Sequence, residues 1–126
     1  MTAQPHGHER RREPRAAERI ALAVSDAGTE LATETKNLSA SGTYCTVDRF
    51  IAPMSKLELH FELPNHGAHP TKIRCTGVVV RVDPVITQAD RGRYNVAVLF
   101  TELTQRDRAA IARFVQQRLA HASSAH

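Results

Sequence analysis

A strict alternation of apolar and polar residues between Lys56 and Leu63 constrains the fold more than any other stretch of this chain. A period of two is the repeat of a β-strand with one buried face and one wet face. Four apolar side chains fall on one face, and four polar side chains, including His60, fall on the other. We therefore predict a strand over 56–63, with His60 on its solvent-facing side.

Five further segments have strand character and are separated by turn residues. They cover residues 16–24, 30–36, 43–47, 71–82 and 94–100. Residues 26–29 are typical of a hairpin turn between the first two of these segments. Gly77 marks a bend or bulge in the strand over 71–82, because a glycine inside a strand weakens the ladder.

The hydrophobic period changes after Phe100. Thr104 and Asp107 have the spacing of a capping box, which predicts a helix from Gln105 to about Ala120. Its apolar residues recur at helical spacing and are expected to pack on the core, with a dimer contact as the alternative: Ile111, Phe114, Val115 and Leu119. Six strands and one terminal helix do not suit a parallel sheet with crossover helices. The predicted fold class is therefore mainly β, a six-stranded antiparallel β-barrel with a C-terminal α-helix on one open end.

The chain of 126 residues is most simply one domain. We expect disordered tails at 1–8 and 121–126 on either side of a single domain at 9–120. The apolar runs are far shorter than the ~20 residues of a membrane span, and the N-terminus lacks the apolar stretch of a secretory signal. We therefore expect a soluble, cytoplasmic protein that does not insert into a membrane.

The positions of cysteine and histidine do not favour a metal site or an enzyme. Cys45 and Cys75 lie in apolar segments and are predicted to be buried thiols, with a disulfide or a reactive thiol as the alternatives. His6 and His8 are close in the sequence, but no carboxylate or cysteine completes a metal site with them. The sequence contains no HExxH, Gly-x-Ser-x-Gly or P-loop motif. We therefore assign no catalytic residue, no metal and no cofactor.

An arginine cluster precedes the first strand. Residues 9–15 read Glu-Arg-Arg-Arg-Glu-Pro-Arg, and Pro14 favours an extended conformation for the residue before it. The net charge of +4 is mild, so this local concentration of arginine favours a local anion over a protein-wide field for DNA. The planar guanidinium suits bidentate contact with phosphate and can bond a guanine edge. We therefore predict a flexible arm at 9–15 that surrounds a compact polyanion.

A short polar turn follows further along the chain, where residues 37–42 read Asn-Leu-Ser-Ala-Ser-Gly. Asn37 can both donate and accept a hydrogen bond, so it can read a base edge, and Ser39 offers a hydroxyl. Gly42 either lets the backbone approach a ligand closely or takes a positive φ. We predict that the arm and this turn close on one another to form a single anion-binding site.

Together the two stretches resemble the PilZ family of bacterial cyclic di-GMP receptors. Arg11 and Arg15 match the family pattern R-x-x-x-R, with Arg10 as an additional arginine, and the pattern [D/N]-x-S-x-x-G is matched by Asn37, Ser39 and Gly42. Many members have Asp at the first position of the second pattern. The resemblance covers about residues 9–120 and implies the PilZ split-barrel fold with a switch loop at 9–15. It also implies that the loop arginines engage the phosphates and guanine faces of cyclic di-GMP, often as an intercalated dimer, while the turn holds a guanine edge and the sugar-phosphate.

The function implied by the resemblance is a stand-alone receptor for cyclic di-GMP. Such a receptor relays the signal by reordering its N-terminal arginine loop against a downstream protein effector. One alternative is a PilZ-like adaptor that no longer binds nucleotide and acts through protein contacts. Another is a small nucleic-acid-binding barrel, which is disfavoured because the strands lack the interleaved aromatic residues on which bases stack. Motility, polysaccharide synthesis and transcription are equally open as the output.

Overall fold

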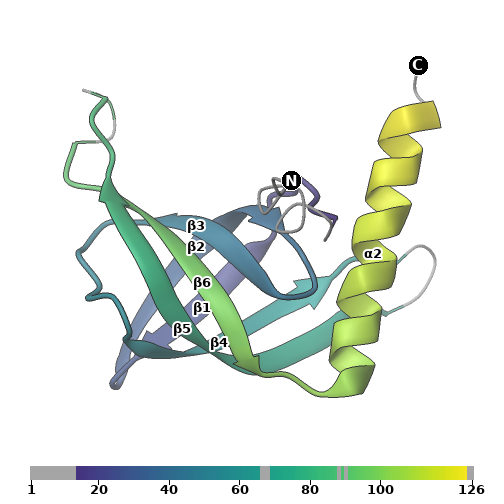
Figure 1. The fold of residues 1–126 in the computed structure, drawn as a ribbon, viewed down its shortest axis with the longest axis horizontal. Helices are drawn as coiled ribbons and strands as arrows, with labels where there is room; N and C mark the ends of the chain where they lie inside the picture. The colour runs from purple at the N-terminus through teal and green to yellow at the C-terminus, as the bar shows by residue number, and fades with distance from the viewer. Residues whose placement is uncertain (1–13, 66–68, 88, 90, 125–126) are drawn as a thin grey trace, which may run out of the picture.

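The computed structural model of the chain describes residues 14–65, 69–87, 89 and 91–124. Six strands form a closed antiparallel barrel, and one helix stands beside one end of it (Figure 1). The order of strands around the barrel is β1-β2-β3-β6-β5-β4, and β1 closes it by pairing with both β2 and β4. The predicted fold class is confirmed. The elements are β1 (Ala21–Asp26), β2 (Thr29–Leu38), β3 (Gly42–Val47), β4 (Lys56–Leu63), β5 (Thr71–Pro84), β6 (Tyr94–Glu102) and α2 (Gln105–Ser124).

The core is built mainly from the inward faces of the strands. β4 buries every second residue, as its alternation predicted, and His60 on its other face is exposed. Phe61 of β4 and Phe100 of β6 stack inside the barrel with 6.2 Å between their ring centroids. Full burial of an apolar side chain of this size stabilises the folded state by roughly 1.5–3 kcal/mol. The inward side chains of β4 are at most 2% exposed, namely Leu57, Leu59, Phe61 and Leu63.

β1 and β2 are joined by a two-residue turn at the predicted position. Asp26 and Thr29 form the last pair of the ladder, with Ala27 (φ 52°) and Gly28 (φ 88°) between them. Positive φ at both central positions is the geometry of a type I′ turn, whose twist matches that of the flanking strands. The turn therefore sets the register between the first two strands of the barrel.

The first strand begins at Ala21, so the predicted start at residue 16 was wrong. Residues 16–20, here called the strap, lie along β2 without forming a regular ladder. Ala16 exchanges two backbone hydrogen bonds with Leu38, of 3.0 and 2.9 Å. Between this point and β1, the side-chain hydroxyl of Thr35 bonds to the backbone of the strap. A side chain thus replaces part of the strand ladder, in a segment whose alanines have low strand propensity.

Helix α2 begins at Gln105, as predicted. The hydroxyl of Thr104 caps it by accepting a 3.1 Å hydrogen bond from the N–H of Asp107. The helix ends at Ser124, so residues 121–124, which were expected in a disordered tail, are helical. The reason is that alanine is a strong helix former and that no Gly or Pro interrupts this segment.

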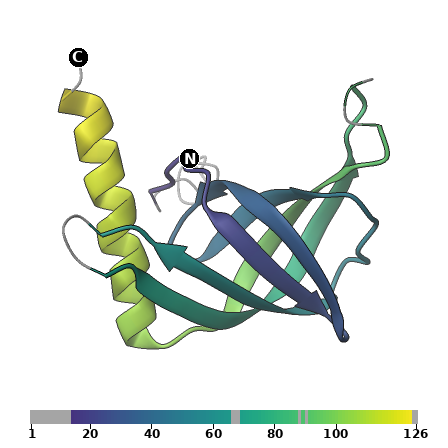
Figure 2. The same ribbon diagram turned by 180° about the vertical axis from the view of Figure 1, so that it is seen from behind.

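The helix face that packs on the barrel is shorter than predicted. Ile111, Phe114 and Val115 are at most 5% exposed and belong to the core, which confirms the predicted packing for these three residues. Leu119, however, is 38% exposed. Figures 1 and 2 show the cause, because the last turns of α2 extend past the strands of the barrel. The prediction that Leu119 packs on the core was therefore wrong, and a dimer contact through this residue stays a prediction.

The remaining strand boundaries differ from the predictions by at most two residues. Gly77 lies at a register shift between β5 and β6, in agreement with the predicted bulge. Cys45 and Cys75 are both buried free thiols, as predicted. Burial raises the pKa of each to about 11, and the charge of Asp107 adds to the rise at Cys75. Within the described ranges, no helix combines the length and the apolarity needed to cross a lipid bilayer.

Candidate anion-binding site

The structure brings Arg15 and Asn37 together from segments 22 residues apart in the sequence. Nη1 of Arg15 donates a 2.5 Å hydrogen bond to Oδ1 of Asn37. The contact forms because the next residue, Ala16, is bonded to β2 immediately after Asn37. The last residue of the arm is thereby held against the first residue of the second motif. Arg10 and Arg11 lie outside the described residues, so their place at the site stays a prediction.

Ser39 organises the turn between β2 and β3 from the inside. Its exposed fraction is 0%, and its hydroxyl accepts hydrogen bonds of 3.3 Å from the backbone N–H groups of Ser41 and Gly42. The hydroxyl also lies 3.3 Å from the carbonyl oxygen of Gly42, to which it can donate. Serine hydroxyls commonly stabilise turns in this way. In this structure Ser39 positions the turn, and its direct contact with a ligand stays a prediction.

Gly42 is required by the packing of two strands. A methyl group added there would lie 2.3 Å from the carbonyl oxygen of Val98 on β6, a distance that backbone atoms do not tolerate. The φ angle of Gly42 is not positive, and its backbone lies close to that of β6. The expectation of a positive φ was therefore wrong, and the close approach of β3 to β6 requires glycine at this position. The close approach of a ligand to Gly42 stays a prediction.

A pocket of about 460 Å³ lies beside the Arg15–Asn37 contact. Strand pairing explains its layout, because one cross-strand row runs through it. Asn37 of β2 pairs with Tyr44 of β3, Tyr44 pairs with Ala97 of β6, and Ala97 pairs with Arg81 of β5. Paired residues on neighbouring strands project from the same face of a sheet. The row therefore carries an amide at one end and a cation at the other, with a small alanine between them that leaves room for a ligand.

The floor of this pocket is apolar and partly exposed. Val80 and Leu99 line it, and their exposed fractions are 51% and 45%. Large apolar side chains that remain open to solvent beside a few polar groups are typical of ligand sites. Thr43 supports one edge by donating a 2.7 Å hydrogen bond to the carbonyl oxygen of Asn37. The arrangement suits a flat aromatic ring that carries phosphate, since the ring can lie on the floor while cations contact the phosphate.

Arg81 and Tyr44 also line this pocket and were not among the residues predicted from the sequence. Simple alternation would place Arg81 on the side of Val79, which is fully buried. A register shift between Val79 and Arg81 inserts one extra residue, so that Val80 and Arg81 are both exposed. β-bulges commonly re-aim side chains in this way. The one available signal was a charged residue that interrupts the apolar run between Val78 and Val82.

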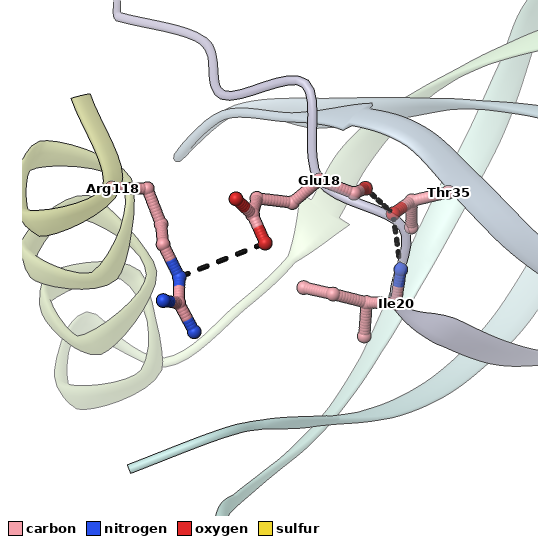
Figure 3. A network of polar contacts seen from close by, with 4 residues as sticks. All are labelled: Glu18, Ile20, Thr35 and Arg118. Carbon is pink, nitrogen blue, oxygen red and sulfur yellow. Dashed lines mark hydrogen bonds and ion pairs between the residues drawn. The ribbon is translucent and has the colours of Figure 1, made fainter. Parts of the chain in front are cut away.

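Helix α2 contacts both the turn and the strap. Nη1 of Arg108 donates a 2.9 Å hydrogen bond to the carbonyl oxygen of Ala40 in the turn. Nε of Arg118 lies 3.6 Å from Oε1 of Glu18 in the strap, as the dashed line in Figure 3 shows. The backbone carbonyl of the same Glu18 accepts a 2.5 Å hydrogen bond from Thr35 of β2. The strap is therefore held between the barrel and the helix.

A second pocket of about 490 Å³ lies elsewhere on the barrel and also has basic residues, including Arg19, Lys36 and Arg93. It contains none of the predicted site residues, and the carboxylate of Glu34 in its lining opposes an anion. It also lacks the exposed large apolar side chains found at the first pocket. In the part of the chain that is described, no group of three His, Cys, Asp or Glu side chains could hold a metal ion. The pocket beside Arg15 is therefore the better candidate.

The fold and the site define a closed antiparallel barrel with a terminal helix and a cation-flanked pocket on its wall. Comparison with protein-family models identifies the class of protein, because the PilZ domain model matches residues 9–117. The chain belongs to the PilZ domain family. A search of curated protein sequences finds no match.

Solved structures with the same fold share little sequence with this chain. The Bacillus subtilis inhibitor of motility (MotI/DgrA) has a TM-score of 0.78 at 18% identity, over 88% of this chain and 52% of that one. The PilZ domain of Escherichia coli YcgR with c-di-GMP has a TM-score of 0.68 at 11% identity, over 91% and 95%. The MrkH–c-di-GMP complex from K. pneumonia has a TM-score of 0.68 at 17% identity, over 99% and 57%. The chain thus spans little more than half the length of the MotI and MrkH chains.

Proposed function

We propose that this chain is a receptor for cyclic di-GMP and that the ligand binds at the pocket beside Arg15. The observation that carries the proposal is the Arg15–Asn37 hydrogen bond, which joins one residue from each of the two sequence motifs at the edge of that pocket. Membership of the PilZ domain family supports it. So do the YcgR and MrkH structures, which were determined with c-di-GMP.

The chemistry of the two residues fits such a ligand. A guanidinium has five N–H donors, so Arg15 can contact a phosphate while one donor bonds to Asn37. The amide of Asn37 offers both a donor and an acceptor for a guanine edge. The apolar floor at Val80 and Leu99 accepts the face of a base. The phosphate, the edge of the base and the face of the base thus each have a matching group within one pocket.

The relay of the signal is part of the same proposal. Arg15 is followed directly by the strap, and the strap contacts helix α2 through Glu18 and Arg118. The turn that carries the second motif contacts the same helix through Ala40 and Arg108. A ligand that draws the arm and the turn together changes the geometry of both contacts with the helix. We propose that the resulting change in the arm and in α2 is read by a protein effector.

Calorimetric titration with cyclic di-GMP tests the proposal. The wild-type chain should bind saturably, and Arg15→Ala should weaken binding about tenfold or more, because a hydrogen bond to a charged group is lost. Arg19→Ala is the matched control, since Arg19 is exposed, lies four residues further on and does not line this pocket. No heat with the wild-type chain would reject the receptor and favour the nucleotide-free adaptor. Equal weakening in both variants would reject the pocket.

A further inference from the structure

The candidate site has a cation at each end. Arg15 contacts Asn37 on β2, and Arg81 projects from β5 at the opposite end of the cross-strand row described above. The two ends are separated by three strand spacings, or ~14 Å. The small side chain of Ala97 and the ring of Tyr44 lie between them, and all these residues line one pocket. A compact ligand with two separated phosphates can reach both ends at once.

The orientation of Arg81 depends on the bulge in β5. Without the extra residue between Val79 and Arg81, the guanidinium would fall on the inward side of the strand, where Val79 is 0% exposed. The bulge instead places Val80 and Arg81 next to one another on the outer face. The bulge thus adds a cation beside Val80, an apolar side chain that simple alternation already places on the outer face.

Two neighbours hold the guanidinium of Arg81 in place. Nε lies 2.8 Å from Oδ2 of Asp83, two residues along the same strand. This hydrogen bond and the charge of Asp83, together with a hydrogen bond to Tyr44, raise the pKa of Arg81 above its usual value. Because Asp83 bonds to Nε, the terminal nitrogen atoms keep donors for an anion. The pair fixes the side chain and leaves terminal N–H donors for phosphate, while the carboxylate of Asp83 offsets part of the positive charge.

We propose that Arg81 is a specificity-determining residue of the site, which contacts the phosphate of cyclic di-GMP that lies farther from Arg15. This inference rests on the function proposed above. It predicts that the site selects a ligand with two separated phosphates, because only such a ligand engages both ends of the row. A mononucleotide such as GMP can reach one end only. Tyr44 and Asp83 are positioning residues for this contact.

The test compares Arg81→Ala with a matched arginine on the same strand. Arg74 is also exposed on β5 but does not line this pocket, so Arg74→Ala removes the same charge elsewhere. Each variant is titrated with cyclic di-GMP and with GMP at low and high salt. We expect Arg81→Ala to weaken cyclic di-GMP binding about fivefold or more, because this ligand would lose a charge-assisted hydrogen bond to its second phosphate. GMP binding should stay within about twofold of the wild type, because GMP bound at Arg15 does not reach Arg81 and a distant exposed charge contributes little. Salt should weaken binding less in Arg81→Ala than in the wild type, because one screened charge pair is missing.

A second variant tests the space between the two ends. Ala97→Leu fills the middle of the row without changing any charge, and it should block cyclic di-GMP while the melting temperature stays close to that of the wild type. Failure of the wild-type chain to bind cyclic di-GMP would overturn both the proposed function and this inference. Binding that Arg15→Ala abolishes, but that Arg81→Ala and Arg74→Ala affect equally, would overturn the inference alone.

Discussion

Arg118 lies with its Nε atom 3.6 Å from a carboxylate oxygen of Glu18, so the C-terminal helix is tied to the segment that directly follows the arm. The guanidinium also lies over the ring of Phe114, 4.8 Å from its centroid. Within the described residues, Nε of Arg118 is buried and has no hydrogen-bond partner, so the ion pair is its main polar contact. The contact is thus loose enough to change when the strap moves.

Replacing Glu18 should loosen the helix more than it destabilises the fold. Glu18→Gln removes an ion pair that is partly exposed, so the free energy of unfolding should fall by at most about 1 kcal/mol. The amides in the second half of α2 should nevertheless exchange with solvent faster, which hydrogen exchange measures segment by segment. Glu102→Gln, which removes the more exposed pair with Lys56, is the control and should leave α2 unchanged. Equal exchange in both variants would show that the Glu18 contact does not hold the helix.

Replacing Gly42 should strain the barrel wall. Gly42→Ala places a methyl group 2.3 Å from the backbone oxygen of Val98, which cannot move without disturbing β6. We expect a loss of about 1–3 kcal/mol or more in the free energy of unfolding, measured by urea denaturation. Gly92→Ala is the control, because its methyl group meets no atom of the described chain within 4 Å and only its positive φ is strained. A smaller loss for Gly42→Ala than for Gly92→Ala would contradict the packing argument.

Replacing Ser39 should weaken the turn. Ser39→Ala removes a fully buried hydroxyl that accepts hydrogen bonds from the backbone of Ser41 and Gly42. Buried donors that lose their acceptor cost about 1–3 kcal/mol, so the midpoint of urea unfolding should fall. Ser25→Ala on β1 offers a partly buried serine outside the turn as the control. If the two variants unfold at the same midpoint, the hydroxyl of Ser39 does not support the turn.

Stability should decline at alkaline pH through Cys45. Burial raises the pKa of this thiol from 9.0 to about 11, so the unfolded chain loses the proton before the folded chain does. The contribution is complete below pH 9 and is lost as the pH rises from 9 to 11. The loss should approach ~2–3 kcal/mol. Unfolding free energies of the wild type and of Cys45→Ala between pH 8 and pH 11 measure it, and parallel curves would refute it.

The barrel could be predicted because its strands are separated by turn residues and most of them alternate against one core. The alternation over 56–63 matches β4 residue by residue, and the period change marks the start of α2. The strap could not be predicted in this way. Part of its hydrogen bonding comes from the side-chain hydroxyl of Thr35, and no local pattern shows that a hydroxyl will replace a strand partner.

The candidate site was predicted only in part, for a related reason. The contact between Arg15 and Asn37 could be predicted, because each residue belongs to a motif that is visible in the sequence. Arg81 reaches the pocket through a one-residue shift of register, and such a shift depends on the pairing of β5 with β6. Leu119 has helical spacing but no barrel beneath it, which depends on the length of the strands. The orientation of Arg81 and the exposure of Leu119 both depend on tertiary structure and not on a local sequence pattern.

The two hydrogen bonds between Ala16 and Leu38 affect the entropy that is lost when a ligand binds at the proposed site. It makes the strap part of the same cooperative unit as the barrel, so the amide of Ala16 should exchange as slowly as those of the strands. The chain ahead of this point is consequently tethered at the edge of the pocket. A tethered group acts at a high effective concentration, because the entropy of bringing it to the site is lost at folding and not again at binding. At the proposed site, Arg15 is therefore expected to act at a high effective concentration, and lengthening the chain between Arg15 and Ala16 should weaken ligand binding.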